Sequence, residues 1–277
     1  MNPGLRPGAS AIDEVGRMDA KVALGDRVVL LGEDGRKHAL TVEPGARRIE
    51  GLGVLDPSSL AGAAFGAVTK VGNRRFILLW PSVLDRVETL HRKAQIILPK
   101  DAAHILMECD ISAGRTVVEG GAGSGAMTTA LASAVVPGGK VVTYDLRAEY
   151  LRQARHNIEQ AGLSEACVFK EGDITAPGAI SEREVDAVVL DIPEPWNAAD
   201  NAWEALRPCG HFACYTPTVN QVEQTVRALR DRRFIEVRSF EVLRRGMEVV
   251  EKGIRPSFEM LGHSGYLTFA RKVLEKF

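Results

Sequence analysis

Hydrophobic and polar positions alternate over short distances in the first third of the chain. The runs at 26–31 and 75–80 are rich in Val, Leu and Ile, and turn signals such as Glu-Pro-Gly at 43–45 separate runs of this kind. Short apolar runs bounded by Gly, Pro, Asn and Asp are typical of strands joined by tight turns. Residues 1–83 are therefore predicted to form a small β-domain, and 84–100 a linker segment.

From residue 101 to 277 the pattern is longer, and apolar runs of strand length alternate with amphipathic stretches of helix length. The runs predict strands near 116–119, 141–145, 166–170, 186–191, 210–215, 234–242 and 265–271. The amphipathic stretches predict helices near 101–109, 125–135, 148–161, 198–206 and 218–230. Strands that alternate with helices at this spacing predict an α/β fold, in which helices cover both faces of a mainly parallel sheet. The last two runs lack a helix signal between them, which favours an antiparallel pair at the sheet edge.

The composition is that of a soluble globular protein, with 45% apolar and 26% charged residues. No apolar run reaches the roughly 18 residues of a membrane span, and the N-terminal residues lack the apolar core of a secretory signal. We therefore expect a cytoplasmic protein with no membrane partner. The four cysteines, at 109, 167, 209 and 214, show no C-x-x-C spacing, so no metal is expected.

The net charge of −1 conceals an uneven distribution. Residues 101–226 carry 8 Lys and Arg against 18 Asp and Glu, whereas 1–100 and 227–277 have net charges of +4 and +5. An acidic centre between basic flanks suits a cationic cofactor inside and a polyanion outside. Solvated helix faces explain the same counts equally well, so the charge pattern alone decides nothing.

The segment 119–125 carries the most specific chemistry in the chain. It reads Glu-Gly-Gly-Ala-Gly-Ser-Gly directly after an apolar run. Gly121, Gly123 and Gly125 let the backbone turn tightly from a strand into a helix, leaving unpaired N–H groups that face a ligand. Asp145 follows the next strand, where a βαβ unit places a carboxylate against a ribose. The pattern predicts a nucleotide-type cofactor pocket, although glycine-rich turns also occur without a ligand.

The spacing E-x-G-x-G-x-G bears on which cofactor is bound. Nicotinamide enzymes use G-x-G-x-x-G around a pyrophosphate, whereas this spacing resembles the first motif of class I S-adenosylmethionine methyltransferases, whose cofactor has a sulfonium and no phosphate. Glu119, at the strand end, suits such a cationic ligand and would repel a pyrophosphate. S-adenosyl-L-methionine is therefore the expected cofactor.

Two further carboxylates follow strands of the same predicted sheet. Asp191 precedes a proline-rich loop at the carboxyl end of a strand, where ligands of α/β proteins bind. It could accept a hydrogen bond from an exocyclic amino group and stabilise positive charge on a methylated base, or it could cap the following helix. Asp173 could bind the adenine of the cofactor or form a simple turn. Trp196 is expected to pack internally, and His263 to be structural or substrate-facing.

Five motifs occur in the order seen in the TrmI family of archaeal and bacterial tRNA (adenine-N1)-methyltransferases. They lie at 92–103, 118–126, 190–196, 215–221 and 262–267, and the resemblance covers nearly the whole chain. It implies a class I, Rossmann-like methyltransferase with a seven-stranded sheet and a small N-terminal β-domain. It also implies tRNA as the substrate, N1 of adenosine at T-loop position 58 as the target, and in some archaea also position 57. The family is typically homotetrameric.

The resemblance implies roles for individual residues as well. Asp191 matches the catalytic aspartate of the family, Asp145 would hold the ribose of the cofactor and Asp173 its adenine. Gln95 lies in the segment that closes over the cofactor in relatives. The methionine moiety would be held by the glycine loop together with Ser124, Gly125, Ala126 and Met127.

One position departs from the family pattern. Relatives usually carry Tyr or His directly before the Pro-Lys-Asp at 99–101, where the ring is thought to position the target adenine, but this chain has Leu98. Leucine can pack on a base face without stacking or hydrogen bonding, so the choice of target nucleotide or the rate is open.

Two other functions remain open on the sequence. A methyltransferase that acts on a small molecule or a protein would bind the cofactor without affinity for tRNA. A non-catalytic tRNA-binding subunit would be expected to lose the glycine loop or Asp191, and this chain keeps both. In the preferred interpretation, basic residues on the flanks would bind tRNA phosphates, for example Arg74, Arg75, Arg244 and Arg245.

Overall fold

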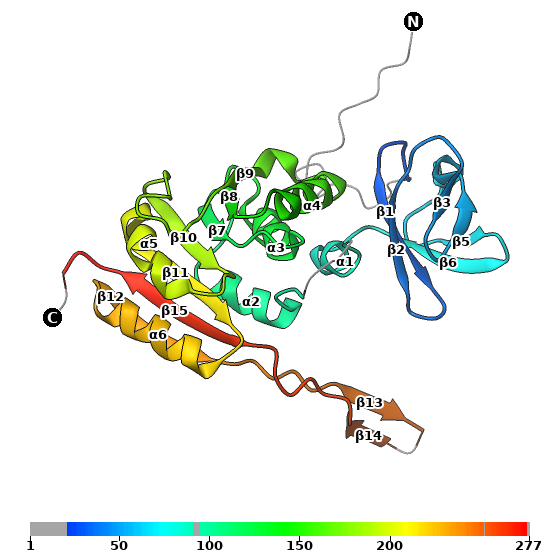
Figure 1. Ribbon diagram of the computed structural model, residues 1–277. Helices are drawn as coiled ribbons and strands as arrows, with labels where there is room; N and C mark the ends of the chain where they lie inside the picture. Colours follow the sequence, from blue (N-terminus) through cyan, green and yellow to red (C-terminus); the bar gives the residue numbers. More distant parts are fainter. Residues whose placement is uncertain (1–20, 91–94, 252, 276–277) are drawn as a thin grey trace, which may run out of the picture.

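The computed structural model describes residues 21–90, 95–251 and 253–275, and Figure 1 shows them as two bodies and a projecting hairpin. The first body is an antiparallel sheet of four strands in the order β2-β1-β6-β5. Its strands are β1 (Arg27–Gly32), β2 (Lys37–Thr41), β5 (Val68–Val71) and β6 (Arg74–Leu79), and beside them lie the pair β3 (Arg47–Ile49) and β4 (Gly53–Leu55) and the 3-10 helix η2 (Pro57–Leu60). Val28, Leu30 and Leu78 are fully buried in a core of its own. The expected small β-sheet is present, and the boundary at residue 83 stays a prediction.

A short helix, α1 (Val83–Glu88), lies between the two bodies and begins one residue before the segment expected to be a linker. Ser82 and Asp85 form a reciprocal capping box at its start, which satisfies two backbone N–H groups that a helix end leaves unpaired. Lys37 of β2 lies 2.7 Å from Asp85 and 2.8 Å from Glu88, so ion pairs tie α1 to the small sheet.

The second body is built on a seven-stranded sheet in the order β12-β15-β11-β10-β7-β8-β9. Its strands are β7 (Thr116–Gly120), β8 (Lys140–Asp145), β9 (Cys167–Glu171), β10 (Val185–Leu190), β11 (Leu206–Thr216), β12 (Phe234–Phe240) and β15 (Tyr266–Lys272). The five strands from β11 to β9 are parallel, and β15 runs antiparallel to both of its neighbours. The expected antiparallel pair at the edge is confirmed.

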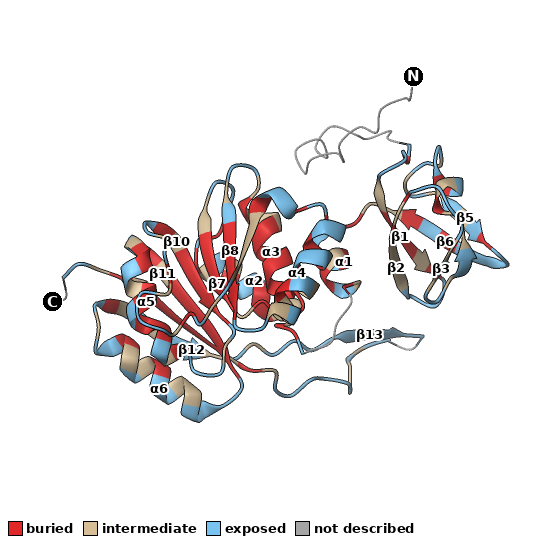
Figure 2. Cartoon of the chain, turned by 45° about the horizontal axis from the view of Figure 1, so that its top comes forward, coloured by how far each residue is buried: buried red, intermediate tan, exposed pale blue. Residues whose placement is uncertain are grey.

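Helices cover both faces of this sheet. They are α2 (Pro99–Glu108), α3 (Ala126–Val135), α4 (Ala148–Gln160), α5 (Ala199–Ala205) and α6 (Val219–Arg230), with 3-10 turns η3 (Ser164–Ala166) and η4 (Pro195–Ala198). Strand residues alternate between two buried clusters, since Val117 faces α2, α3 and α4 whereas Val118 faces α5 and α6. The central strands and α3 are accordingly the most deeply buried elements in Figure 2. Every helix in the described ranges is too short or too polar to cross a bilayer.

The hairpin of β13 (Met247–Val250) and β14 (Gly253–Pro256) was not predicted from the sequence. It lies between β12 and β15 in the chain and projects from the body, with exposed residues along β13 (Figure 2). A strand with solvent on both faces lacks the alternation of apolar and polar residues on which strand prediction depends. The pattern therefore could not reveal it.

Candidate cofactor and active site

The predicted site residues follow strands that lie side by side. Gly120 of β7 is paired with Leu190 of β10 on one side and with Tyr144 of β8 on the other. The chain leaves β7 in one direction across the sheet and later returns to β10 in the other, which makes this the topological switch point where α/β proteins bind ligands. A cleft of about 590 Å³ opens at this edge, within the range of small-molecule sites.

Six of the predicted residues line this cleft, namely Gln95, Gly121, Gly123, Asp145, Asp173 and Asp191. The other five lie outside the lining, namely Glu119, Ser124, Gly125, Ala126 and Met127. The cleft is also lined by residues that had not been singled out, which are Tyr144, Leu146, Arg147, Tyr150, Gly172, Ile174, Thr175, Ile192, Pro193 and Glu194. Leu146 is apolar yet 64% exposed, and its place directly after a strand-end carboxylate is the signal that could have revealed it.

The glycine loop packs directly against the backbone of Asp191. A Cβ atom on Gly121 would lie 2.1 Å from the Asp191 carbonyl oxygen, and Gly121 has a φ of +94°. Both facts require glycine, because other residues rarely adopt this conformation and backbone atoms cannot give way. Gly125, with a φ of +79°, would bring a Cβ to 3.0 Å from the Cα of Ala154 in α4. Close contact with neighbouring backbone explains two of the three glycines.

Asp145 holds the glycine loop from β8. Its Oδ2 accepts from the backbone N–H of Ala122 at 2.9 Å and of Gly123 at 3.4 Å, and its Oδ1 accepts from the N–H of Arg147 at 2.9 Å. On the far side of the loop, Asn157 of α4 donates from Nδ2 to the Ser124 carbonyl at 2.8 Å. The loop is thus fixed from two elements before any ligand binds.

Glu119 lies beneath the loop, fully buried at 1% exposure. Its Oε2 accepts from Thr128 Oγ1 at 2.6 Å and Thr143 Oγ1 at 2.7 Å, while its Oε1 has no hydrogen-bond partner within the part of the chain that the structure describes. Burial raises the Glu119 pKa to about 7, the two hydroxyls oppose that rise, and the charges of Asp191 and Asp145 add to it. A buried carboxyl with one free oxygen is suited to a cationic ligand.

Replacing Glu119 with glutamine is expected to change how stability depends on pH. A raised folded-state pKa means that the unfolded chain ionises first, so this group destabilises the fold progressively as the pH rises from about 4.5 to about 7. The expected loss is about 3 kcal/mol in the parent and absent in Glu119→Gln. Urea unfolding of both proteins at pH 5 and pH 8 measures it. Equal pH dependence in the two proteins would contradict the assignment.

The remaining residues of the glycine motif act through the start of α3. Ala126 and Met127 are buried at 5% exposure each, so their side chains belong to the core. The helix begins after Gly125 without a side-chain cap, and the first N–H groups of a helix have no partner within it. Ser124 is buried at 4% exposure and its Oγ lacks a partner among the described residues. Free donors at a helix N-terminus favour an anionic group such as a carboxylate.

Asp191 opens into the cleft at the end of β10. Its backbone N–H donates to the Gly120 carbonyl at 2.8 Å. Protein surrounds the carboxylate on the sides that do not face the open cleft, and this desolvation, followed by the charge of Asp145, raises the Asp191 pKa to about 6. The N-cap position of the next helical turn, η4, is occupied by Glu194 and not by Asp191. The geometry therefore favours a functional carboxylate over a helix cap.

Asp173 forms the expected turn and lines the cleft, while its contact with the adenine of the cofactor stays a prediction. Its Oδ1 accepts from the backbone N–H and the hydroxyl of Thr175, at 2.9 and 2.6 Å, which forms a turn and lowers the Asp173 pKa. Asn201 of α5 fastens the loop that follows, because its Nδ2 donates to the carbonyls of Ile174 and Ala176 at 2.8 and 2.7 Å. The Asn201 side chain also accepts from the N–H of Gly178 at 3.0 Å. Asp173 thus enters the cleft from a rigid loop.

Replacing Asn201 with alanine is expected to destabilise the protein by about 2 to 3 kcal/mol, because it leaves buried backbone groups unpaired. We also expect weaker cofactor binding, since the loop it holds lines the cleft. Thermal unfolding and calorimetric titration measure the two effects. Asn73→Ala, at an exposed turn of the small sheet, is the control and should change neither. Parent-like cofactor affinity in a destabilised Asn201→Ala would contradict the link to the cleft.

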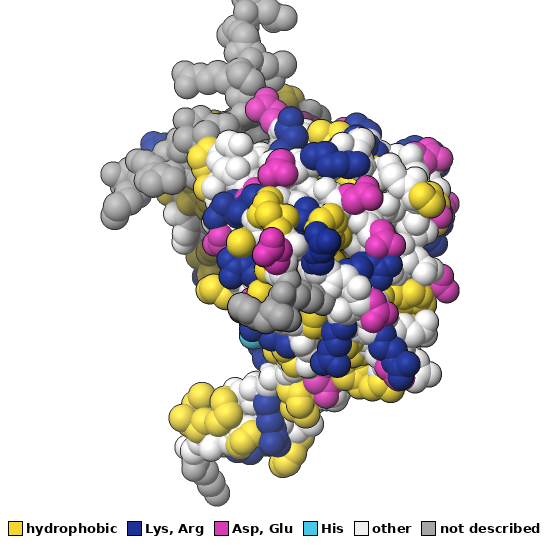
Figure 3. Space-filling view, turned by 90° about the vertical axis from the view of Figure 1, so that its left-hand side faces the viewer, with side chains coloured by type: hydrophobic (Ala, Val, Ile, Leu, Met, Phe, Trp, Pro, Cys, Tyr) yellow, Lys and Arg dark blue, Asp and Glu magenta, His cyan; other side chains and the backbone are white. Residues whose placement is uncertain are grey.

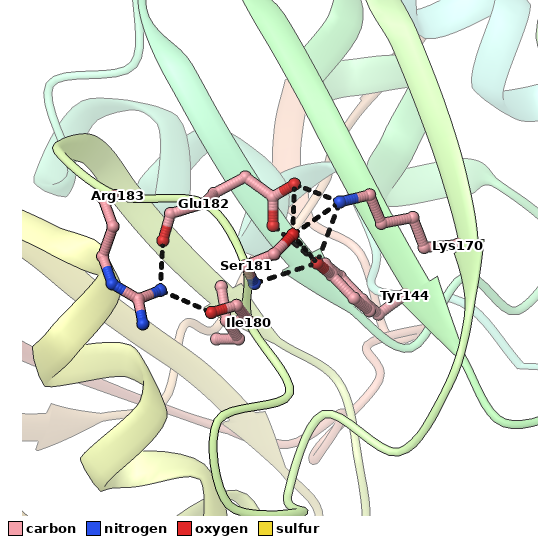
Figure 4. A network of polar contacts seen from close by, with 6 residues as sticks. All are labelled: Tyr144, Lys170, Ile180, Ser181, Glu182 and Arg183. Carbon is pink, nitrogen blue, oxygen red and sulfur yellow. Dashed lines mark hydrogen bonds and ion pairs between the residues drawn. The ribbon is translucent and has the colours of Figure 1, made fainter.

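Tyr144 belongs to a polar network on one wall of the cleft, shown in Figure 4. Its hydroxyl donates to Glu182 Oε2 at 2.5 Å, and Lys170 of β9 pairs with the same carboxylate and donates to Ser181 Oγ at 2.8 Å. The network ties the loop that carries Ser181 and Glu182 to β8 and β9. It fixes the wall on the side of Asp173.

The segment before α2 approaches the cleft from the other side. Gln95 is exposed and lines the cleft, whereas Leu98 is half-buried at the N-terminus of α2 and lies outside the lining. The neighbouring Arg92 and Lys93 of the first motif lie outside the described residues. His263 bonds to Glu241 Oε2 and to the Pro217 carbonyl, both at 3.0 Å, as a structural residue would.

Comparison with known proteins identifies the family. A family model described as the tRNA methyltransferase complex GCD14 subunit matches residues 78–255. The TrmI protein of Methanocaldococcus jannaschii, a tRNA (adenine(57)-N(1)/adenine(58)-N(1))-methyltransferase, is 37% identical over 222 residues, which cover 71% of this chain and 78% of that protein. The chain belongs to the TrmI/GCD14 family. The Thermus thermophilus TrmI, a tRNA (adenine(58)-N(1))-methyltransferase, is 33% identical over 192 residues, which cover 69% of this chain and 75% of that protein.

A solved structure resembles nearly the whole chain, including both bodies. A SAM-dependent O-methyltransferase of Thermotoga maritima superposes with a TM-score of 0.82 at 35% identity, covering 93% of this chain and 96% of that chain. The expected class I methyltransferase fold with an added β-domain is confirmed. Among the described residues, no group of three or more His, Cys, Asp or Glu side chains could hold a metal ion.

Proposed function

We propose that this TrmI/GCD14 member transfers a methyl group from S-adenosyl-L-methionine to N1 of an adenosine in the tRNA T-loop, at position 58 with position 57 as a second candidate. The supporting observation is that Asp191 opens into the cleft directly beside the glycine loop, in a chain whose relatives are tRNA adenine-N1-methyltransferases. A catalytic subunit needs both the glycine loop and the carboxylate. This argues against a non-catalytic tRNA-binding role.

The residues of the cleft fit the cofactor. The unpartnered Oε1 of buried Glu119 suits the cationic amino group of the methionine moiety, directly or through water, and the uncapped start of α3 suits its carboxylate. Asp145 would bind the ribose through Oδ1, which accepts from one backbone N–H only. Leu146 would pack on the adenine, whose 6-amino group Asp173 would bind.

The protein does not need to move a proton before the methyl group is transferred. When bound, the cofactor supplies an electrophilic methyl group on a sulfonium. N1 of adenine attacks through an in-plane lone pair, so no residue needs to remove a proton first. The protein must align the two reactants and stabilise the positive charge that moves onto the base. We assign the second task to Asp191, which accepts a hydrogen bond from the 6-amino group of the target. The target base must leave its tertiary pairing first, at about a few kcal/mol.

The tRNA would bind by its phosphates to basic residues in the segments before and after the part of the chain that forms the cleft. Arg244 and Arg245 are exposed between β12 and the hairpin. Arg74 and Arg75 each lie within 4 Å of an acidic side chain, at 3.4 and 3.8 Å, so part of their charge is already compensated. The pair at 244–245 is the stronger candidate. We place the protein in the cytoplasm with its tRNA substrate.

We propose a homotetramer, and the β13–β14 hairpin supports self-association. Met247, Val249, Ile254 and Phe258 are 61%, 81%, 67% and 83% exposed, and Figure 3 shows hydrophobic side chains gathered on this projection. Exposed apolar groups on an unpaired hairpin are typical of protein interfaces. Sedimentation over a range of concentrations tests the assembly, and a monomer throughout would contradict it.

Incubation with labelled S-adenosylmethionine and an unmodified tRNA transcript tests the activity, with nucleoside analysis and mapping of the modified position. We expect N1-methyladenosine in the T-loop, and the mapped position will show what Leu98 does to target choice. Label in 2′-O-methylated nucleosides, or cofactor binding with no tRNA methylation, would contradict the proposal. The second result would favour a small-molecule or protein substrate.

A further inference from the structure

Gln221, at the start of α6, makes two sets of contacts with different consequences. Its Oε1 accepts from the backbone N–H of Thr218 at 3.1 Å and from the Thr218 hydroxyl at 2.7 Å, which completes the capping box of the helix. Its Nε2 donates to the carbonyl of Pro193 at 2.9 Å. One amide therefore joins the first turn of α6 to the loop that follows Asp191.

Few other hydrogen bonds join this loop to the rest of the protein. Pro193 and Pro195 have no N–H to donate, and η4 begins only after Glu194. The segment is anchored at its start, where the Asp191 N–H donates to Gly120 at 2.8 Å. Among the described residues, Gln221 makes the only hydrogen bond from a side chain to the backbone of residues 192–195. Hydrogen bonds thus join Asp191 and the next two residues to other elements at two points, one on β7 and one on α6, while Ile192 packs on the apolar core.

We infer that Gln221 is a positioning residue, which sets the orientation of the Asp191 loop through the Pro193 carbonyl. This inference rests on the proposed function, because it assigns Asp191 the contact with the target base. Ile192, Pro193 and Glu194 also line the cleft, so a shift of the loop would move one wall of the site. Small displacements of reacting groups lower rates strongly, whereas the hydrogen bond itself lies at the surface and contributes little to folding.

The variant Gln221→Glu separates the capping of α6 from the hydrogen bond to Pro193. Gln221→Glu keeps an oxygen that can accept from Thr218, and a negative charge in the first turn of a helix is favourable. It removes the donor to Pro193 and places a carboxylate against a carbonyl oxygen. We expect a melting temperature equal to or above that of the parent, and a kcat for tRNA methylation lower by about five- to tenfold, with smaller changes in KM. Gln221→Ala should lose both activity and stability.

Thr218→Ala provides the matched control. It removes the hydroxyl side of the capping box and leaves the donor of Gln221 to Pro193 in place. We expect a lower melting temperature, with a kcat within about twofold of the parent. Opposite effects of the two variants on stability and on kcat cannot arise from a purely structural role of the cap.

Hydrogen exchange of the peptide that spans 190–198 provides a readout that does not depend on the identity of the substrate. Faster exchange there in Gln221→Glu, with parent-like exchange in α6, is the expected result. A parent protein that methylates no tRNA would refute the proposed function, while this exchange comparison would still test the positioning. Gln221→Glu with parent kcat and parent exchange in 190–198 would overturn the inference.

Discussion

Asp191→Ala is expected to lower kcat for tRNA methylation by about 10² to 10³-fold, because it removes the group assigned to stabilise charge in the transition state. Asp191→Asn keeps an oxygen acceptor but loses the charge, and should fall between this variant and the parent. The carboxylate lies at the mouth of the cleft and makes no hydrogen bond or ion pair among the described residues, so both variants should fold. Single-turnover methylation of a tRNA transcript measures the effect. Undiminished turnover by Asp191→Ala would refute the assignment.

The pH dependence of the same variants provides an independent test. The reaction needs Asp191 ionised, and its pKa is raised to about 6, so the parent rate should rise as the pH increases through about 6 and this limb should be absent in Asp191→Asn. Stability should respond in the opposite sense. An acid with a raised folded-state pKa destabilises the fold as the pH rises from the pKa of the group in the unfolded chain to about 6. Asp191→Asn removes this loss of folding stability. Asp173→Asn, which should mainly raise the KM for the cofactor, is the control.

Much of the fold could be predicted from the sequence because the buried strands have a strong signal. Val117 and Val118 pack on opposite faces of the sheet under different helices, and a strand covered on both faces appears as an uninterrupted apolar run. The site was predicted for a related reason, since parallel strands bring their carboxyl ends together and Gly121, Asp145 and Asp191 each follow one. The topology of the sheet thus brings together residues that are far apart in the sequence.

What could not be predicted depends on contacts between distant residues. Asn201 and Gln221 look like ordinary polar helix residues in the sequence, and only the structure shows the loops that they hold. The motif also could not separate residues that face the ligand from those that support the loop. Ala126 and Met127 are both buried outside the cleft lining, although they belong to the same motif as Gly121. A motif specifies a local backbone shape, and burial depends on what packs against it.

Gly121→Ala is expected to have the second large effect, because the site has no space for a methyl group at this position. The Cβ would lie 2.1 Å from the Asp191 carbonyl oxygen and 2.9 Å from its carbonyl carbon, so either the glycine loop or the Asp191 loop must move. We expect cofactor affinity and methylation each to fall at least about 100-fold. The protein should also lose about 2 to 4 kcal/mol of stability, from overpacking together with an unfavourable φ. Calorimetric titration with the cofactor and urea unfolding measure these effects.

Gly25→Ala separates the effect of overpacking from the effect of an unfavourable φ. Gly25 has a φ of +91°, nearly that of Gly121, but its Cβ would meet no atom within 4 Å, and it lies in the turn before β1, in the first body. The control should therefore lose only the stability due to backbone conformation, about 1 to 2 kcal/mol, and keep its cofactor affinity. The difference between the two variants measures the contact between the glycine loop and the Asp191 loop. If Gly121→Ala bound the cofactor as Gly25→Ala does, the close contact between the glycine loop and the Asp191 loop would not be needed for cofactor binding.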